Sequence, residues 1–333
     1  MKNDAQIIEG KLDLVVPFSR SDADPWSLLP ILRHPKVDLQ PLRWASNWNP
    51  APRNRYDRWA MAQTVLMCPP TFFDVREVKN PYMGRGIDRV RAQKQWENLR
   101  RSLEDAGMKV ETIDPVPDLE DMVFAANQVF VGCHDQVGKF IVPSRMLHSS
   151  RQKEVPFYVE WFRQRGYTVI ELDLAGEYLE GHGDLLWHPD RSKIWAAYGF
   201  RSTRGGVEKF ATAMRDLGIH VIALQLVDAH CYHLDTSLCP LNAEAALINP
   251  DAFSRESLDA LRASWKRIHE ISAQEAHQFM GNGIVANGRY ITPCLTENLS
   301  KILAAERLTP VVVDTSEFEK SGGSAFCMKS FLA

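Results

Sequence analysis

Hydrophobic and polar residues follow the same order in three stretches of the chain. In each, a charged helical pattern ends at a glycine and an apolar strand pattern begins three residues later: Glu104–Asp114, Arg163–Asp173 and Arg215–Gln225. Glycine is the usual residue where a helix stops in the left-handed conformation. The glycines stand at positions 107, 166 and 218, so the copies are 59 and 52 residues apart. This spacing predicts a repeated β/α module, with Glu306–Thr315 as a weaker fourth copy.

Apolar residues at helical spacing predict five amphipathic helices. They are Val90–Leu103, Glu154–Arg165, Gly206–Leu217, Ser254–Ile268 and Thr296–Leu308, the last with Thr296 as its N-cap. Short apolar runs predict strands at Thr64–Cys68, Gln128–Cys133, Phe140–Pro143, Lys193–Tyr198, His220–Val227, Cys231–Leu238, Gly283–Thr292 and Ser324–Phe331. About ten strands and five or six helices interleave in this pattern, which indicates an α/β protein. Neither GxGxxG nor GxxxxGK[ST] opens a helix, so the sequence does not support a nucleotide-binding fold.

Composition and charge exclude some classes of binding partner. The 333 residues are 45% hydrophobic and 24% charged, as in ordinary globular proteins. Lysine and arginine number 39 against 42 acidic residues, so there is no basic excess for nucleic acid. The sequence contains no apolar run of the roughly 18–20 residues that span a bilayer, and its start does not resemble a secretory signal. We therefore expect a cytoplasmic protein whose partner is neither nucleic acid nor a membrane.

The first sixty residues differ from the rest of the chain. They are rich in Trp, Pro, Arg and Asn, and lack the repeated helix and strand pattern. We expect residues 1–60 to be an N-terminal extension packed on a main domain of residues 61–333. Such an extension is also a candidate contact in a homo-oligomer.

Four short segments place polar residues in apolar surroundings. Asn127 stands just before a predicted strand, where a turn residue is the more common interpretation and a placed hydrogen bonder the alternative. Glu180–Trp187, EGHGDLLW, puts Glu180 and Asp184 around two glycines, which suits either a polar turn or acids that face a pocket. If Cys231–Leu238 is a strand, the side chains of its His-x-Asp pair point to one face.

The fourth segment, Ser321–Lys329, presents a cysteine four residues after a Gly-Gly pair. Cys327 is either a reachable nucleophile, if a base or positive charge holds the thiolate, or a buried structural thiol. The six cysteines form no CxxC pair, so a structural zinc site is not supported. His230 and His233 are an alternative metal pair, but no third histidine or thiolate follows at a ligand spacing.

Together these segments favour covalent catalysis on a cationic substrate. One cysteine, one His-x-Asp pair and several carboxylates match a planar guanidinium, whose fixed donors pair with carboxylates. The chain resembles the guanidine-modifying enzymes of the pentein superfamily, and among them the arginine dihydrolase type. The resemblance runs from about Thr64 to the end. It rests on six segments in order: MCPPTFFDVREVKNPYM at Met67–Met83, FAANQVFVG at Phe124–Gly132, EGHGD at Glu180–Asp184, YGFRS at Tyr198–Ser202, HLDTSLCPL at His233–Leu241 and GGSAFC at Gly322–Cys327.

The resemblance implies an α/β propeller of five ββαβ-type modules around a pseudo-fivefold axis, with the active site in the central channel. It also implies three catalytic roles: Cys327 is the nucleophile, His233 is the general acid and base, and Glu180 holds His233 and one guanidinium edge. The implied substrate-binding residues are Asp235, Asn127, Asn80, Asp184, Arg145 and Arg201, the two arginines for the α-carboxylate. Asn127 stands where deiminases carry an aspartate, and His182 within EGHGD is a neutral spacer or a second acid/base.

The implied reaction passes through a covalent S-alkylthiouronium, formed by thiolate attack and cleaved by water that His233 activates. This chemistry needs neither a metal nor an organic cofactor, and the expected partner is a small-molecule guanidino substrate. Four alternatives remain at this level: an amidinotransferase that passes the amidino group to an amine, a methylarginine dimethylaminohydrolase, a non-catalytic binding protein of the same fold and, last, a zinc hydrolase.

Overall fold

The computed structural model describes residues 64–84 and 86–333 of the chain. These residues contain five small sheets of three strands each. In every sheet the middle strand pairs antiparallel with one neighbour and parallel with the other. The first two sheets are β15 (Ser330–Phe331), β1 (Thr64–Met67) and β2 (Lys109–Thr112), and β3 (Val129–His134), β4 (Gly138–Pro143) and β5 (Thr168–Val169). The third is β6 (Leu185–Trp187), β7 (Lys193–Tyr198) and β8 (His220–Gln225). The last two are β9 (Leu238–Pro240), β10 (Ala245–Ile248) and β11 (Arg267–Glu270), and β12 (Ile284–Ala286), β13 (Arg289–Thr292) and β14 (Thr309–Val312).

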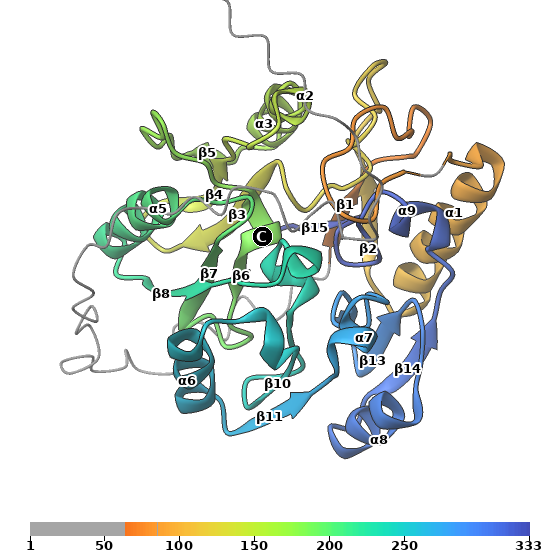
Figure 1. Ribbon diagram of the computed structural model, residues 1–333. Helices are drawn as coiled ribbons and strands as arrows, with labels where there is room; N and C mark the ends of the chain where they lie inside the picture. Colours follow the sequence, from red (N-terminus) through yellow and green to blue (C-terminus); the bar gives the residue numbers. More distant parts are fainter. Residues whose placement is uncertain (1–63, 85) are drawn as a thin grey trace, which may run out of the picture. The chain divides into compact units, whose positions relative to one another are not determined.

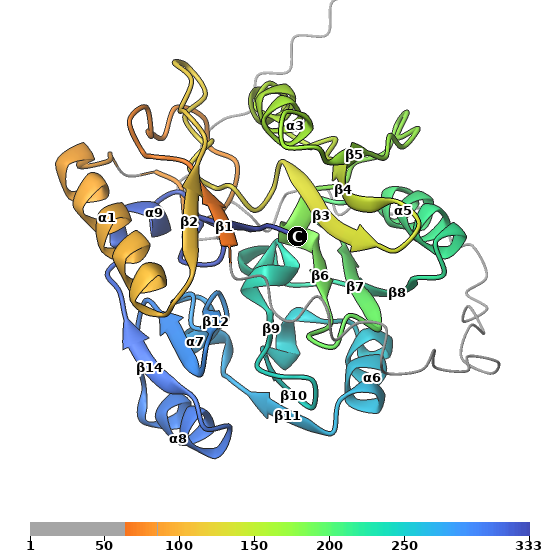
Figure 2. The ribbon, with the colours of Figure 1, turned by 180° about the vertical axis from the view of Figure 1, so that it is seen from behind.

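One long helix connects the two parallel strands of each sheet, as a parallel crossover requires. These helices are α1 (Arg89–Asp105), α3 (Val155–Arg163), α5 (Arg204–Asp216), α6 (Arg255–Ser264) and α8 (Glu297–Ala305). They lie on the outside of a ring whose centre is formed by the sheets (Figures 1 and 2). The predicted α/β propeller of five ββαβ-type modules is confirmed.

The end of the described chain completes the first module. Strand β15 pairs antiparallel with β1, with Leu66 opposite Ser330. In the other four modules the antiparallel partner directly precedes the middle strand in sequence. Because the last strand must reach the first sheet, the segment just before it, which carries Cys327, lies next to the start of the described chain.

The helix stops follow the predicted repeat. Gly107, Gly166 and Gly218 have φ of 81°, 76° and 71°, in the left-handed region where glycine is favoured. In the weaker fourth copy Arg307 takes the same conformation, with φ of 58°. Thr296 caps α8 as expected, since its hydroxyl accepts a hydrogen bond from the Leu299 amide at 3.1 Å.

Three predicted strands are wrong in whole or in part. Cys231–Leu238 contains two 3-10 turns, η4 (Ala229–Cys231) and η5 (Leu234–Thr236), and only its last residue enters β9. Side-chain bonds stabilise these turns: Asp228 caps η4, and the Thr236 hydroxyl donates to the His233 carbonyl at 2.7 Å. Of Ser324–Phe331, only the last two residues form a strand, and Gly283–Thr292 is a hairpin that turns at Asn287 and Gly288. Asn-Gly is the usual pair for such a two-residue turn.

The remaining short elements lie in the connections within and between the modules. They are α2 (Ser149–Gln152), α4 (Gly181–Asp184), η6 (Pro250–Ala252), α7 (Ala273–Ala276) and α9 (Ser316–Glu319). Among the described residues, the helices are all too short or too polar to cross a membrane. The expected N-terminal extension, residues 1–60, and its candidate oligomer contact lie outside the described residues.

Candidate active site

Residues from five of the six recognised segments, together with Asp121, Arg151, Tyr232 and Ser321, line one small cavity. Its walls are Lys79, Asn80, Met83, Asp121, Phe124, Asn127, Arg151, Arg201, Tyr232, His233, Ser321, Gly322, Gly323 and Cys327. They come from segments far apart in sequence that the propeller brings together. The cavity measures about 20 Å³, which is room for about one water molecule.

The Cys327 thiol has two polar neighbours inside this site. Its Sγ donates to Asp235 Oδ2 at 3.2 Å, and Asn282 Nδ2 donates to Sγ at 3.2 Å. Asn282 also fixes the backbone here, because its Oδ1 accepts from the Phe326 and Cys327 amides at 3.1 and 3.3 Å. All three side chains are buried. The sulfur is thus held in one direction, with a carboxylate on one side and an amide donor on the other.

Burial determines the protonation of Cys327 and Asp235. Burial raises the pKa of Asp235 to about 7, and the second carboxylate oxygen, Oδ1, has no hydrogen-bond partner among the described residues. Burial, and then the Asp235 carboxylate, raises the pKa of the Cys327 thiol well above its usual value. The Cys327 thiol therefore holds its proton in this arrangement. A bound cation would reverse the balance, because it stabilises both the carboxylate and the thiolate.

A buried lysine, Lys329, interacts electrostatically with both Asp235 and Cys327. Lys329 is fully buried, its Nζ has no hydrogen-bond partner among the described residues, and it lies over the rings of Phe326 and Phe331, 3.0 and 3.9 Å from their centroids. Burial lowers the pKa of Lys329 well below its usual value, while Asp235 and Cys327 act in the opposite direction. An amine without a partner in an apolar site is held neutral.

His233 is oriented by an ion-pair network. Glu180 Oε2 lies 2.8 Å from His233 Nε2 and accepts from Arg201 Nη1 at 3.1 Å, while Oε1 accepts from the Leu147 amide at 2.9 Å. Burial would raise the pKa of Glu180, but Arg201 and His233 outweigh it and hold this pKa well below its usual range. Because Glu180 occupies Nε2, the other ring nitrogen, Nδ1, is the one left for proton exchange. Both Glu180 oxygens have partners within the protein and Glu180 does not line the cavity, so its expected contact with a guanidinium edge stays a prediction.

Asp184 supports the loop that carries His233 rather than lining the cavity. Its Oδ2 accepts from the Ser202 hydroxyl at 2.6 Å, and its Oδ1 accepts from the Leu234 amide at 3.1 Å. Burial raises the pKa of Asp184 to about 6. Since both oxygens have partners and Asp184 is buried away from the cavity, its predicted contact with substrate is not supported.

His182, the unusual residue within EGHGD, is a neutral spacer. Its Nε2 accepts from the Val131 amide at 3.1 Å, and its Nδ1 lies 3.1 Å from the Leu185 carbonyl oxygen, to which it donates. Burial lowers the pKa of His182 to about 3. Both ring nitrogens have backbone partners, so no nitrogen is left for acid/base work.

Asn127 is both a turn residue and a placed hydrogen bonder. Arg151 Nη1 donates to Asn127 Oδ1 at 3.1 Å, which fixes the orientation of the amide. Arg151 is in turn held by Glu154, 3.1 Å from its Nη2. The Asn127 Nδ2 donor is buried without a partner among the described residues. Asn127 thus lines the cavity and carries an unused donor that is packed against Gly183.

The side chains of Asn127 and His233 both lie against the backbone at Gly183. A Cβ on Gly183 would lie 2.3 Å from Asn127 Nδ2 and 3.2 Å from the His233 ring. These two side chains thus pack directly on the backbone of α4, which the two glycines of EGHGD permit.

Asn80 and Arg201 line the cavity as predicted, whereas Arg145 does not. Asn80 Nδ2 donates to the Ser321 carbonyl at 2.9 Å, and Arg201 lies 4.6 Å over the ring of Tyr232. Arg145 donates to the Leu174 carbonyl at 2.5 Å and lies 5.6 Å from the centre of the Tyr178 ring. The expected role of Arg145 toward the substrate carboxylate is therefore not supported by its position.

The sequence interpretation missed Asn282, Arg151 and Lys329. Asn282 stands in Gly-Asn-Gly just before β12. A polar residue between two glycines beside a strand was a usable signal. Arg151 lies in an unremarkable charged run, and only its burial beside Asn127 shows that it belongs to the site.

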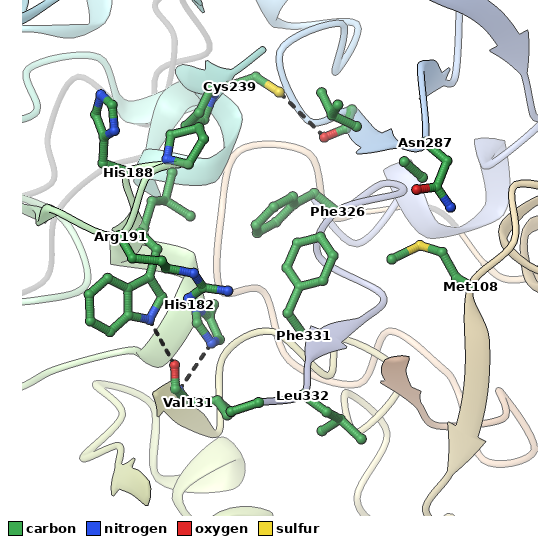
Figure 3. Close-up of a pocket in the computed structure, with 18 residues that line it drawn as sticks. Met108, Val131, His182, His188, Arg191, Cys239, Asn287, Phe326, Phe331 and Leu332 are labelled. Atoms are coloured by element: carbon green, nitrogen blue, oxygen red, sulfur yellow. Dashed lines mark hydrogen bonds between the residues drawn. The ribbon is translucent and has the colours of Figure 1, made fainter. Parts of the chain in front are cut away.

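A larger cavity of about 120 Å³ lies elsewhere, and Cys327 and His233 do not line it. Figure 3 shows Phe326 and Phe331 at its centre, with Arg191 and His182 on one side and Asn287 and Met108 on the other. It is mostly apolar and holds neither a thiol beside a carboxylate nor an acid beside a histidine. The smaller cavity is therefore the candidate active site.

Comparison with known proteins gives concordant matches. The family described as "N,N dimethylarginine dimethylhydrolase, eukaryotic" matches residues 81–332. The bifunctional arginine dihydrolase/ornithine cyclodeaminase ArgZ of Synechocystis sp. is 34% identical over 272 residues, which cover 79% of this chain and 37% of that protein. The N(G),N(G)-dimethylarginine dimethylaminohydrolase of Mycobacterium tuberculosis is 33% identical over 272 residues, covering 81% of this chain and 86% of that enzyme.

A solved structure agrees with these matches. The N-terminal domain of ArgZ, an arginine dihydrolase bound to its substrate, superposes with a TM-score of 0.75 at 32% identity. The match covers 80% of this chain and 97% of that domain. This chain thus corresponds to one domain of the bifunctional cyanobacterial protein and spans 37% of its length.

Proposed function

Because the chain belongs to the N,N dimethylarginine dimethylhydrolase family, we propose that it hydrolyses arginine, with Cys327 as the nucleophile. The enzyme is a hydrolase of C–N bonds in linear amidines and acts on a guanidino substrate. The choice of arginine is supported by the similarity to the arginine dihydrolase ArgZ, and the role of each residue by its contacts at the cavity. The observation that carries the proposal is the Cys327 thiol beside Asp235, in one cavity with a histidine that Glu180 orients.

The proposed first half of the reaction begins when the guanidinium enters the site. Its positive charge pairs with Asp235, the Cys327 proton passes to His233 Nδ1, and the thiolate attacks the guanidinium carbon. The tetrahedral adduct then breaks its C–N bond to the leaving amine, which takes a proton from His233 Nδ1. The product of this half is a covalent S-alkylthiouronium and one free ammonia.

Water completes the turnover. His233, now neutral, takes a proton from water as the oxygen adds to the thiouronium carbon. The C–S bond breaks and the ureido product, citrulline, is released from Cys327. Asn282, which donates to Sγ, stabilises the sulfur each time it carries negative charge.

Asn127 favours a second round on the ureido product. A guanidinium has only donors, whereas a ureido group presents a carbonyl oxygen that accepts. The unpaired Asn127 Nδ2 offers a donor to that oxygen, and Arg151 prevents the amide from turning its own oxygen to the cavity. We therefore expect citrulline to stay bound and to be hydrolysed to ornithine, carbon dioxide and a second ammonia, so that two ammonia are released per arginine.

The deciding experiment measures ammonia, citrulline and ornithine together, with arginine, monomethylarginine and dimethylarginine in parallel. Two ammonia and one ornithine per arginine support the proposal. One ammonia with stoichiometric citrulline would make the enzyme a deiminase. No reaction until an amine acceptor is added would make it an amidinotransferase.

Hydrolysis of methylated arginine is the second candidate. The matched family and the M. tuberculosis relative bear the name of that activity. In the same assay, release of dimethylamine from dimethylarginine with arginine inert would establish it instead.

A further inference from the structure

Two histidines and an aspartate converge just outside the candidate active site. Asp228, His230 and His277 each offer one ligand atom, and these atoms all lie within 4.8 Å of one another. Asp228 and His230 lie between β8 and β9, whereas His277 follows α7, between β11 and β12. The sequence had offered His230 and His233 as a metal pair, but Glu180 occupies His233 Nε2. The third ligand comes from a residue 47 positions after His230, which no local spacing rule would find.

Asp228 lies within hydrogen-bond distance of one histidine nitrogen and farther from the other, at a separation that suits two ligands of a shared ion. Asp228 Oδ2 lies 2.9 Å from His277 Nε2, and Asp228 Oδ1 lies 3.6 Å from His230 Nδ1. In a tetrahedral site with ligand bonds of about 2.0–2.1 Å, neighbouring ligand atoms are about 3.3 Å apart. The 3.6 Å separation is too long for a hydrogen bond, but Nδ1 of His230 is the ring nitrogen next to the carboxylate.

The two imidazoles also lie close together. The ring centroids of His230 and His277 are 4.4 Å apart, with a 31° angle between the planes. Each side chain is about one third exposed, 36% for His230 and 34% for His277, so water can complete the coordination. Asp228 accepts from the His230 backbone amide at 2.9 Å, which holds the carboxylate as an outer hydrogen bond does in metal sites.

We infer that Asp228, His230 and His277 form a binding site for a divalent transition-metal ion of the zinc type, with water as the remaining ligand. Two imidazoles and one carboxylate are ligands that Zn²⁺ accepts, and the absence of a thiolate in the set disfavours the softer Cu⁺. The ion replaces the proton that otherwise lies between His277 and Asp228. The site is separate from the proposed chemistry at Cys327 and does not depend on it.

A bound ion would stiffen one wall of the candidate active site. Tyr82 donates to the His230 carbonyl at 3.2 Å and packs its ring edge-on against His230, with centroids 5.7 Å apart. The Tyr82 amide donates to Asn80 Oδ1 at 3.0 Å, and Asn80 lines the cavity. His233 follows His230 by three residues. An ion that links these turns to α7 therefore holds two segments that carry cavity residues.

The test measures metal binding without turnover. The Cys327→Ala variant is used throughout, since it removes the thiol that is the competing soft ligand in the cavity. The full chain is freed of metal with a chelator and titrated calorimetrically with Zn²⁺, and then with Co²⁺, whose visible absorption reports coordination. We expect one equivalent of Zn²⁺ and a rise in melting temperature on binding.

Matched variants decide where the ion binds. Adding His277→Ala should weaken Zn²⁺ binding by more than about 10-fold, and so should Asp228→Asn, the milder change. Loss of a residue that only hydrogen-bonds to a metal ligand already costs about 10-fold, so loss of a ligand itself should cost more. Adding His134→Ala, at the end of β3 in another module, should change nothing. Zn²⁺ binding weaker than about 100 µM, or equal binding by folded His277→Ala and Asp228→Asn variants, would overturn the inference. Neither result depends on which substrate the enzyme hydrolyses.

Discussion

The thiol of Cys327 donates a hydrogen bond to the carboxylate of Asp235, with Sγ 3.2 Å from Oδ2. In the ligand-free protein this pair holds its proton, because burial raises the pKa of both groups. Under the proposed function this carboxylate pairs with the guanidinium. Substrate binding and thiolate formation would then be coupled, because a cation stabilises the charged form of both groups.

Replacing the proposed nucleophile should abolish turnover. In Cys327→Ala we expect kcat to fall by at least about 10³-fold, because the covalent intermediate cannot form. The circular dichroism spectrum and melting curve should stay close to wild type. Cys294→Ala, at a half-buried cysteine outside the cavity, serves as control. Activity retained in Cys327→Ala would assign the chemistry to another residue.

Alkylation should depend on the charge of the reagent. At pH 7 we expect chloroacetamidine, a cationic guanidine mimic, to modify Cys327 at least ~10-fold faster than iodoacetamide after correction for intrinsic reactivity. The cation pairs with Asp235 and favours the thiolate, whereas the neutral reagent meets a thiol with a raised pKa. The rates are measured by mass spectrometry of the modified protein. Equal corrected rates would remove the proposed coupling.

The product pattern should change in Asn127→Asp. A carboxylate there keeps the contact with Arg151 but replaces the free Nδ2 donor by an acceptor, which a ureido oxygen cannot use. We expect citrulline to accumulate and ammonia to fall from two toward one per arginine. Asn298→Asp, at an exposed position of α8, controls for the added charge. An unchanged product ratio would show that Asn127 does not select the second hydrolysis.

A single methyl group at position 183 should misplace two site residues. In Gly183→Ala the new Cβ would meet Asn127 Nδ2 at 2.3 Å and the His233 ring at 3.2 Å, so both must shift. We expect kcat to fall by about 10²-fold, the usual cost of a displacement near 1 Å. Gly86→Ala, where a Cβ has open space around it, should have wild-type kinetics. Equal kinetics in both variants would mean that this close packing is not needed.

The contribution of Asp235 to the free energy of unfolding should change with pH. The pKa of this group is raised from 3.8 in the unfolded chain to about 7 in the fold, so the charged form is disfavoured in the folded state. Its contribution is fully favourable below about pH 4 and is lost as the pH rises through 7. At pH 8 we expect Asp235→Asn to be more stable than wild type by on the order of 2–4 kcal/mol, although inactive.

The same comparison at pH 4 should show no such gain. Urea unfolding at both pH values measures the difference, with Asp259→Asn, exposed on α6, as control. A gain that is equal at pH 4 and pH 8 would show that Asp235 is not held protonated by the fold.

The sequence determined the repeated module and the segments of the site. The glycine stops at Gly107, Gly166 and Gly218 mark the repeat because a left-handed helix end is a local requirement of the backbone. The helices were predicted within a few residues, except for the end of α6, since apolar spacing is also a local property. Cys327, His233 and Asn127 were recognised because each stands in a short polar segment within apolar surroundings.

Only the tertiary structure decided which of these groups face one another. The alternation argument put His233 and Asp235 on one strand face, but Asp228 and Thr236 fold that stretch into turns, so the two side chains serve different partners. Arg145 and Asp184 carry suitable charges, yet backbone groups and Ser202 already satisfy them. Asn282 and Arg151 enter the site through contacts 45 and 24 residues away in sequence. Burial, which raises the pKa values of Cys327 and Asp235, is a property of the packed chain and cannot be read from a residue type.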